Sequence, residues 1–306
     1  MRSLMPRMYL FRKIRYVLKM RSVKSDLISG DSGISVVIPT HFGIGKSWNA
    51  NSPIIEKCIR SIIDANPTHG LELVIVSSNL QSHNFFGLLD SKFSKRVKME
   101  FLDESNHEFN FSRNINIGIK ASSYSNLIVL NDDVLFLELN SIAQIHSRLI
   151  SHPECIYGFL LLFPDLSVQH AGVSVTSSSL THFFHKVNVK ELEQIHGFIG
   201  NPYQVSAATG AVMAMNKEVW ECVGGFDESF PLNFNDIDFC LRSRINGYEI
   251  WQDNSIAFMH YESATRSIGA KKDEIDLFFA RYDPLPKLDP YLNRLLERNS
   301  SLIALL

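Results

Sequence analysis

Cysteine is scarce in this chain of 306 residues, and the few cysteines form no pattern. They are far apart in the sequence, with no C-x-x-C pair and no zinc-ligand spacing. This spacing excludes the common zinc modules and gives no sign of a disulfide framework. We expect buried thiols in a reducing, cytoplasmic compartment. The four positions are Cys58, Cys155, Cys222 and Cys240.

An excess of charge of one sign is also missing, as are long apolar runs. The formal net charge of −2 argues against a general nucleic-acid-binding protein. No uninterrupted apolar run approaches the roughly 20 residues that span a bilayer. Apolar residues make up 45% of the chain and charged residues 20%, which is typical of a globular protein. The length allows one large or two modest domains.

The N-terminal segment, residues 1–30, has no acid before residue 26 and is rich in Lys and Arg. Apolar residues are interleaved with these cations, and their runs are too short for a secretory signal peptide. The pattern favours a basic amphipathic segment that contacts an anionic membrane surface. It would place the protein peripherally on the cytoplasmic face of the inner membrane. The alternative is a disordered basic tail.

Apolar runs alternate with segments of helical spacing up to residue 137. This alternation predicts an α/β fold in which helices cover both faces of a mostly parallel central sheet. Ligands of such sheets bind beyond the carboxyl ends of the strands. The expected strands are 34–40, 71–76, 97–102 and 126–130, and the expected helices are 53–65, 85–93 and 111–121.

The pattern changes after residue 137. A helix at 139–150 and a strand at 155–163 are followed by a turn and an extended segment that ends at residue 175. Residues 176–200 have weak periodicity and are interpreted as a loop or lid. A strand over 205–215 contains Thr209 and Gly210, whose small size allows close approach of a ligand or of another backbone. A helical tail is expected over 269–306.

The fourth strand leads directly into Asn131-Asp132-Asp133. Adjacent acids at the edge of a sheet are costly unless a cation lies beside them. Carboxylates in this arrangement favour Mg²⁺ or Mn²⁺ that also carries a diphosphate. The alternative is a polar turn.

A second acidic stretch lies at 234–242. The apolar spacing predicts a helix capped by Asn235 or Asp236 and ended by Gly247. At a helix start, free N–H groups would keep Asp236 ionised and fixed, as a general base requires; the alternative role is a cap alone. Asp238 points elsewhere, so the two acids are not a facing pair.

Two strand-like segments, 248–251 and 255–259, lead to His260 and then to a loop of small residues with a single Arg266. A histidine at a strand end beside such a loop suggests a metal and phosphate site. The alternative is a structural histidine.

Taken in order, these motifs resemble family 2 glycosyltransferases of the GT-A fold, over residues 33–266. The match includes residues 36–40, 131–133, 224–228 and 235–242. Residues 109–114, 168–173 and 260–263 are similar to the bacterial branch that includes rhamnosyltransferases of surface polysaccharide.

The resemblance implies a role for each matching position. Asp133 and His260 would bind Mn²⁺ or Mg²⁺, and the imidazole favours Mn²⁺. Asp236 would be the catalytic base. Where the family carries an acidic residue near the nucleotide base, this chain has Ser78. The implied donor-binding residues are Pro39, Thr40, Ser77, Asn79, Arg113, Asn131, Asp132 and Arg266, and the implied acceptor-binding residues are Asp238, His170, Thr209 and Gly210.

The implied function is that of an inverting glycosyltransferase. It would move a sugar from a dTDP-, UDP- or GDP-linked donor to a glycan or lipid-linked glycan during bacterial surface polysaccharide (O-antigen) synthesis. Residues 31–137 would bind the nucleotide sugar, and residues 138–268 of the same GT-A domain would form a smaller acceptor-side and catalytic half. Two alternatives stay open. One is a nucleotidyltransferase, although residues 41–46 lack phosphate-loop spacing. The other is a non-catalytic sugar-nucleotide-binding subunit, because Asn131 replaces an expected acid.

Overall fold

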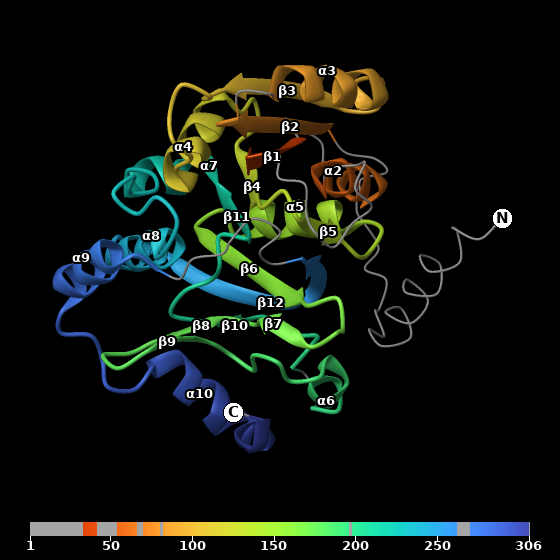
Figure 1. Ribbon diagram of the computed structural model, residues 1–306. Coiled ribbons are helices and arrows are strands. Elements are labelled where there is room, and N and C mark those ends of the chain that lie inside the picture. The colour runs from red at the N-terminus through yellow and green to blue at the C-terminus, as the bar shows by residue number, and fades with distance from the viewer. Residues whose placement is uncertain are drawn as a thin grey trace.

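The computed structural model describes residues 33–41, 54–65, 70–79, 82–195, 198–261 and 270–305 (Figure 1). Its main feature is a ten-stranded mixed sheet with the strand order β10-β12-β6-β11-β4-β1-β2-β3, to which β5 and β7 attach at the side. The strands of the first half run parallel to one another. They are β1 (Gly33–Thr40), β2 (Gly70–Ser77), β3 (Lys98–Asp103) and β4 (Asn126–Leu130).

The second half of the chain extends the same sheet. β11 pairs antiparallel with both β4 and β6, whereas β6 and β12 are parallel to each other. β6 and β12 therefore run in the direction of β1 and β4, and the carboxyl ends of all these strands lie at one edge. The added strands are β5 (Val134–Phe136), β6 (Cys155–Leu162), β7 (Val168–His170), β10 (Tyr203–Gln204), β11 (Val212–Asn216) and β12 (Glu249–His260).

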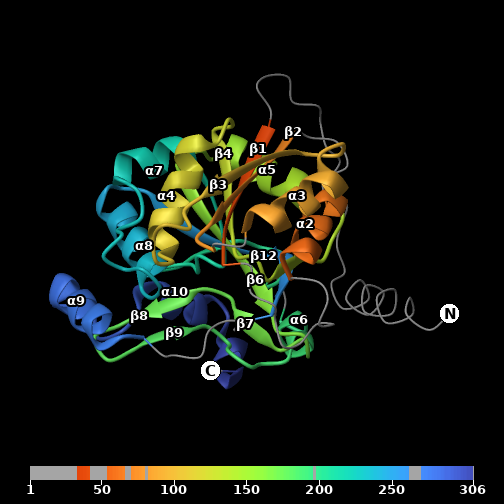
Figure 2. The same ribbon diagram turned by 45° about the horizontal axis from the view of Figure 1, so that its top comes forward.

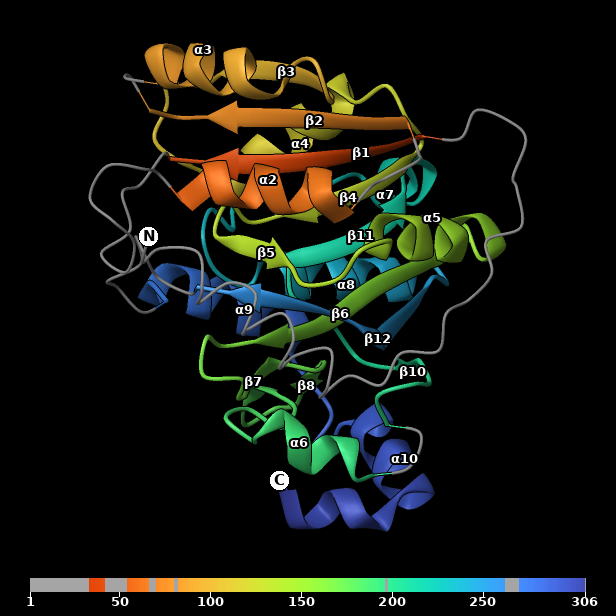
Figure 3. The ribbon, with the colours of Figure 1, turned by 90° about the vertical axis from the view of Figure 1, so that its right-hand side faces the viewer.

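Helices cover both faces of this sheet (Figure 3). In β1, Ile34, Val36 and Ile38 contribute to one core cluster and Val37 to another. Because side chains alternate along a strand, the two clusters lie on opposite faces. The predicted α/β architecture is confirmed. On the face of Val36 are α2 (Ile54–Ala65), α3 (Ser82–Phe93) and α5 (Ser141–Ser151), and on the face of Val37 are α4 (Phe111–Ala121), α7 (Lys217–Val223) and α8 (Asn235–Ile245).

A smaller layer packs below β12 (Figure 2). The segment 176–200, predicted as a loop or lid, in fact contributes to this layer's core, because Phe183, Phe184 and Phe198 are buried. Periodicity missed it because its elements are only a few residues long. The layer contains β8 (Val173–Val175), β9 (Leu180–His182), α6 (Val189–Glu193), α10 (Pro290–Arg298) and η1 (Ser300–Leu305), while α9 (Lys272–Tyr282) lies beside α8.

Three further expectations need correction. The strand predicted over 205–215 begins only at Val212, and the two strands predicted after residue 247 are one, with an irregularity between Asp253 and Ala257. All four cysteines are free, as expected, but Cys222 is exposed rather than buried. None of the helices in the described ranges has the length and apolar character needed to span a bilayer.

Candidate functional site

Asp133 and His260 meet at the carboxyl edge of the sheet. The short strand β5 follows Asp133 directly and pairs antiparallel with the end of β12, so that Val134 lies opposite His260. The backbone N–H of Tyr261 also donates to the carbonyl of Asp133, 3.1 Å away. This pairing brings His260 Nε2 to within 3.0 Å of Asp133 Oδ1. Both residues are only 8% exposed, so the pair is largely shielded from solvent.

The orientation of His260 is set by Gln169 in β7. His260 Nδ1 faces the side-chain oxygen of Gln169 at 2.5 Å. In the tautomer in which Nδ1–H donates to this oxygen, Nε2 carries the lone pair that faces Asp133. The amide of Asn131 lies 3.4 Å from the same Nε2. In this tautomer two acceptor atoms, Nε2 and Asp133 Oδ1, lie 3.0 Å apart and are able to bind one ion.

These two side chains fit a divalent cation of the Mn²⁺ or Mg²⁺ type. Neighbouring ligands in octahedral coordination at about 2.1 Å are about 3 Å apart, which matches the observed separation of Asp133 and His260. Such ions are held by one or two protein groups together with substrate phosphates. No cluster of three or more His, Cys, Asp or Glu side chains suited to a metal occurs among the described residues. The remaining ligands would come from the substrate and water.

Asp132 points to β1, where the hydroxyl of Thr40 donates to its Oδ2. Burial and the neighbouring charge of Asp133 raise the pKa of Asp132 to about 7, although the Thr40 hydrogen bond and His260 act in the other direction. Cys58 of α2 lies behind this group and donates its S–H to the carbonyl of Asn131 at 3.7 Å. The loop after β4 thus holds one acid against β1 and the other against β12.

Asp236 lies in the first turn of α8. Its Oδ2 accepts the backbone N–H of Gly210 at 2.9 Å, and its Oδ1 accepts that of Ile237 at 2.8 Å. The predicted cap is wrong: the helix begins at Asn235, and Phe234 occupies the cap position in the left-handed region at φ 61° with no side-chain cap bond. The carboxylate is nevertheless held in place by the backbone N–H groups of Gly210 and Ile237.

A short series of backbone contacts connects Asp236 to the Asp133–His260 pair. Gly210, which donates to Asp236, precedes Ala211, whose carbonyl accepts the N–H of Asn131 at 2.9 Å. The side chain of Asn131 in turn lies beside His260. The three residues given metal and catalytic roles are therefore gathered at one edge of the sheet, although they come from three separate parts of the chain.

The residues expected to bind the donor line the same edge at the ends of β1 and β2. Pro39 and Thr40 pair with Val76 and Ser77. Ser77 Oγ accepts the backbone N–H of Asn79 at 3.2 Å, and the Asn79 amide donates to the carbonyl of His41 at 2.8 Å.

Arg113, Ser78 and Arg266 are the other positions that were considered for donor binding. Arg113 donates to the carbonyl of Glu108 and lies 3.9 Å from the Glu104 carboxylate. Ser78 is buried and receives a hydrogen bond from the amide of Asn114 at 3.0 Å. Arg266 and most of the loop after His41 lie outside the described residues.

Two of the residues expected to bind an acceptor have fully buried side chains with partners inside the protein. Asp238 is 0% exposed and accepts hydrogen bonds from Arg242, Arg281 and Tyr282. His170 Nδ1 lies 2.8 Å from Nδ1 of His182. Burial and the nearby charge of His182 hold the pKa of His170 well below its usual value, so its imidazole is neutral. Both are positioned to stabilise the fold rather than to contact an acceptor.

Thr209 and Gly210 lie next to Asp236. Gly210 packs close to Phe111 of α4, since a Cβ built there would lie 3.3 Å from that ring and 3.4 Å from Asp236 Cβ. The hydroxyl of Thr209 accepts the N–H of Ala211 at 3.2 Å. These two positions are the expected acceptor residues that border the site.

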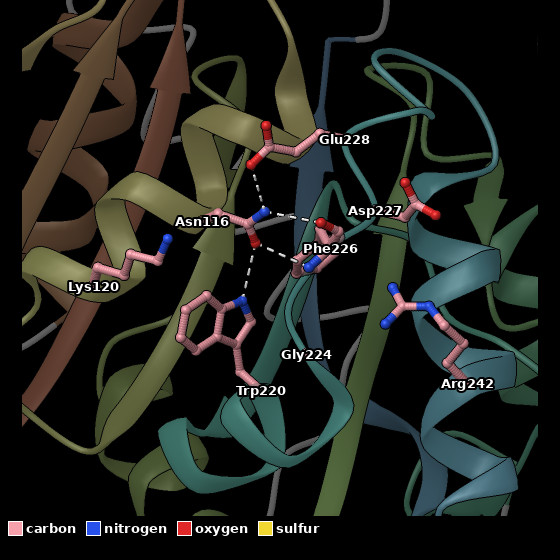
Figure 4. Close-up of a pocket in the computed structure, with 8 residues that line it drawn as sticks. All are labelled: Asn116, Lys120, Trp220, Gly224, Phe226, Asp227, Glu228 and Arg242. Carbon is pink, nitrogen blue, oxygen red and sulfur yellow. Dashed lines mark hydrogen bonds between the residues drawn. The ribbon is translucent and has the colours of Figure 1, made fainter.

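A separate pocket of about 420 Å³ lies between α4, α7 and α8 (Figure 4). Asn116 joins its walls, because its side chain accepts N–H groups from Trp220 and Phe226 and donates to Phe226 and Glu228. Arg242 is similarly engaged with Asp238 and two carbonyls. The side chains of Asn116 and Arg242 are therefore already satisfied by groups of the protein, and they hold the walls of the pocket together.

Two elements of the site were missed by sequence reasoning. Residues 134–136 are too few for a periodic signal, yet β5 places Asp133 beside His260. Gln169 was noted only as part of the resemblance, without a role. Gln169 lies in the three-residue strand β7, and nothing in the local sequence predicts its contact with His260.

Comparison with known proteins agrees with this geometry at the level of fold. No family model matches the chain. It is 27% identical over 272 residues to the O-antigen biosynthesis protein RfbC of Myxococcus xanthus, covering 87% of this chain and 20% of the relative. It is also 25% identical over 293 residues to the uncharacterized protein y4gI of Sinorhizobium fredii (strain NBRC 101917 / NGR234), covering 90% and 31%. The chain thus spans less than a third of the length of these relatives.

Among solved structures, the crystal structure of GalNAc-T7 with UDP, GalNAc and Mn²⁺ is similar, with a TM-score of 0.60 at 13% identity, covering 80% of this chain and 47% of that one. At this identity the similarity concerns the fold. The chain has an α/β fold, with a mixed and mostly parallel sheet, that is structurally similar to GT-A glycosyltransferases. It is a distant homologue of the O-antigen biosynthesis protein RfbC.

Proposed function

We propose that the chain is a metal-dependent, inverting glycosyltransferase that transfers a sugar from a nucleoside-diphosphate donor to a hydroxyl of a glycan or lipid-linked glycan of bacterial surface polysaccharide. The observation that carries the proposal is the convergence of Asp133, His260 and Asp236 at one sheet edge. The relative RfbC, named for O-antigen biosynthesis, supports the polysaccharide assignment. The similar GalNAc-T7 structure, which contains UDP and Mn²⁺, supports the donor and metal classes.

In this proposal the donor diphosphate lies against Asp133 and His260, with the nucleoside over the ends of β1 and β2. Asn131 and Asp132 hold the loop in place through contacts with His260 and Thr40. The metal, when bound, neutralises the charge that develops on the leaving diphosphate. Arg113 at the start of α4 adds positive charge on the donor side.

Asp236 is assigned as the base that removes the proton of the attacking hydroxyl. Its two hydrogen bonds from backbone N–H groups fix the orientation of the carboxylate. Asp238, the nearest other carboxylate in sequence, is engaged with two arginines and a tyrosine, so it is not free for chemistry. One carboxylate at the reacting carbon supports a single displacement, which inverts the configuration at that carbon.

A screen of nucleotide sugars for thermal stabilisation, with and without Mn²⁺, tests this proposal. A ligand that binds only the folded state raises its stability by about 2.7 kcal/mol at one hundred times Kd. We expect one UDP-, dTDP- or GDP-linked sugar to stabilise the wild type with Mn²⁺ present, and to do so much less in Asp133→Ala. No stabilisation by any donor, or stabilisation that is independent of both Mn²⁺ and Asp133, would contradict the proposal.

A further inference from the structure

The segment that leads into α8 is held from outside the sheet by one face of α9. Glu274, Phe278, Arg281 and Tyr282 are spaced at i, i+4, i+7 and i+8, so they lie on one side of this helix. All four contact the segment 227–238. Figures 1 and 2 both show α9 beside α8.

Glu274 holds Leu232 and Asn233, which lie four and three residues before Asp236. It is only 4% exposed, and its carboxylate accepts the backbone N–H groups of Leu232 and Asn233 at 3.1 and 2.9 Å. Its second oxygen accepts the side-chain amide of Asn233 at 2.7 Å. A buried carboxylate is retained at such a position only when hydrogen bonds compensate its desolvation, and here backbone donors of this one segment supply them.

Phe234 shows why this segment needs external support. It adopts a left-handed conformation at φ 61°, which is unfavourable for a residue with a side chain. Its ring stacks on Phe278 of α9 with centroids 5.0 Å apart. The conformation of Phe234 sets the direction in which α8 begins, and with it the position of Asp236 two residues later.

The C-terminal end of α9 contacts the first turn of α8 at Asp238. Arg281 bonds to both Asp227 and Asp238 at 2.7 Å, and the hydroxyl of Tyr282 donates to Asp238 at 2.7 Å. The start of α4 also contacts this segment, but at residues further from Asp236, namely the carbonyls of Phe230 and Pro231.

We propose that α9 is a positioning element for Asp236, with Glu274 as its principal positioning residue. The inference deepens the function proposed above and rests on it, because Asp236 is the assigned base. Glu274 does not touch the reacting groups. It acts through residues 232–234, whose conformation carries the carboxylate to Gly210.

Hydrogen exchange of the full chain tests the positioning without reference to activity. Glu274→Gln places an N–H₂ group among N–H donors, while Asp276→Asn makes the matched change at an exposed position on the same helix. We expect faster exchange over residues 232–238 in Glu274→Gln, with residues 239–245 unchanged, and wild-type exchange in Asp276→Asn. Equal exchange in both variants over 232–238 would overturn the proposal.

The kinetic consequence separates positioning from general destabilisation. Glu274→Gln should lower kcat by about tenfold or more, since small displacements of a catalytic group are costly. The affinity for the nucleoside diphosphate of the stabilising donor, measured with Mn²⁺, should stay at the wild-type value, and a parallel loss of this affinity would overturn the assignment. If Glu274→Gln does not fold, Tyr282→Phe removes only the hydroxyl to Asp238, and a kcat loss without a change in this affinity is again expected. An inactive wild type would count against the proposed function, whereas the exchange result would still decide the role of α9.

Discussion

His260 Nε2 lies 3.0 Å from Asp133 Oδ1, although the two residues are on strands far apart in the sequence. The contact depends on β5, which turns the chain back along the end of β12 immediately after Asp133. Because Gln169 engages the other nitrogen of the ring, the imidazole is aimed at the carboxylate rather than free to rotate. The pairing of β5 with β12 therefore forms the candidate metal site, because it brings Asp133 and His260 together.

Removing either member of this pair should weaken metal-dependent nucleotide binding. We expect Asp133→Ala and His260→Ala each to reduce the affinity for the nucleoside diphosphate of the stabilising donor, measured with Mn²⁺, by about a hundredfold, because among the described residues these two side chains are the proposed ligands of the ion. Isothermal titration calorimetry measures this directly. The exposed His107→Ala provides a control that should bind as the wild type does.

Gln169 should matter for metal affinity although it is not a ligand. Loss of a group that orients a ligating histidine typically costs about 10–100-fold in affinity, so Gln169→Ala should weaken Mn²⁺ binding by that amount. Gln169→Glu keeps an acceptor for Nδ1–H and should restore most of it. Mn²⁺ binding followed by electron paramagnetic resonance provides the measurement, and equal affinities in Gln169→Ala and wild type would refute the role.

Asn116 should be important for stability rather than for ligand binding. Its side chain makes four hydrogen bonds that join α4 to the segment 220–228. Asn116→Ala leaves the buried donors of Trp220 and Phe226 unpaired, which should lower the free energy of unfolding by about 2–4 kcal/mol. Lys120→Ala changes an exposed residue of the same pocket and should be within about 0.5 kcal/mol of the wild type. Urea denaturation compares the two variants.

Glu72 predicts a dependence of stability on acid pH. Burial acts to raise the pKa of Glu72, but hydrogen bonds from Lys98, Ser35 and Ser123 outweigh it and hold the pKa below its ordinary value of 4.5. A depressed folded-state pKa stabilises the protein above the ordinary value, and this contribution is lost as the pH falls through the folded-state pKa. Glu72→Gln should therefore be about 1–3 kcal/mol less stable near neutral pH.

The difference between wild type and Glu72→Gln should narrow as the pH falls below 4.5, because protonation removes the same interactions that the substitution removes. Thermal unfolding at a series of pH values measures it. A difference that stays constant down to acid pH would show that the ionised form of Glu72 is not what stabilises the fold.

The central sheet could be predicted because its strands are continuous apolar runs buried on both faces, as at residues 34–40 and 126–130. The sequence also predicted that Asp133, Asp236 and His260 lie at the ends of strands or helices. Asp133 and His260 come at the end of apolar strand patterns, and Asp236 comes at the start of a helical one. That β4 and β12 end at the same edge follows from the antiparallel insertion of β11, and one sequence does not show which strands are neighbours.

Contacts between residues that are far apart in the sequence could not be predicted from it. Asp238 lies in the same first turn of α8 as Asp236, but Arg281 and Tyr282 of α9 donate to its carboxylate and keep it out of the site. Phe234 carries no local signal for its left-handed conformation, because aromatic residues rarely adopt one. In both cases tertiary packing decides the outcome.

The most direct test of the account is the comparison of wild type with Asp236→Asn, which keeps the size of the side chain and removes the base. With the nucleotide sugar identified by stabilisation and its glycan acceptor, sugar transfer should fall by about 10²–10⁴-fold, the usual contribution of a general base. Binding of the donor with Mn²⁺ should remain that of the wild type. Transfer by Asp236→Asn at the wild-type rate would contradict the assignment of Asp236 as the base, and with it the proposed mechanism.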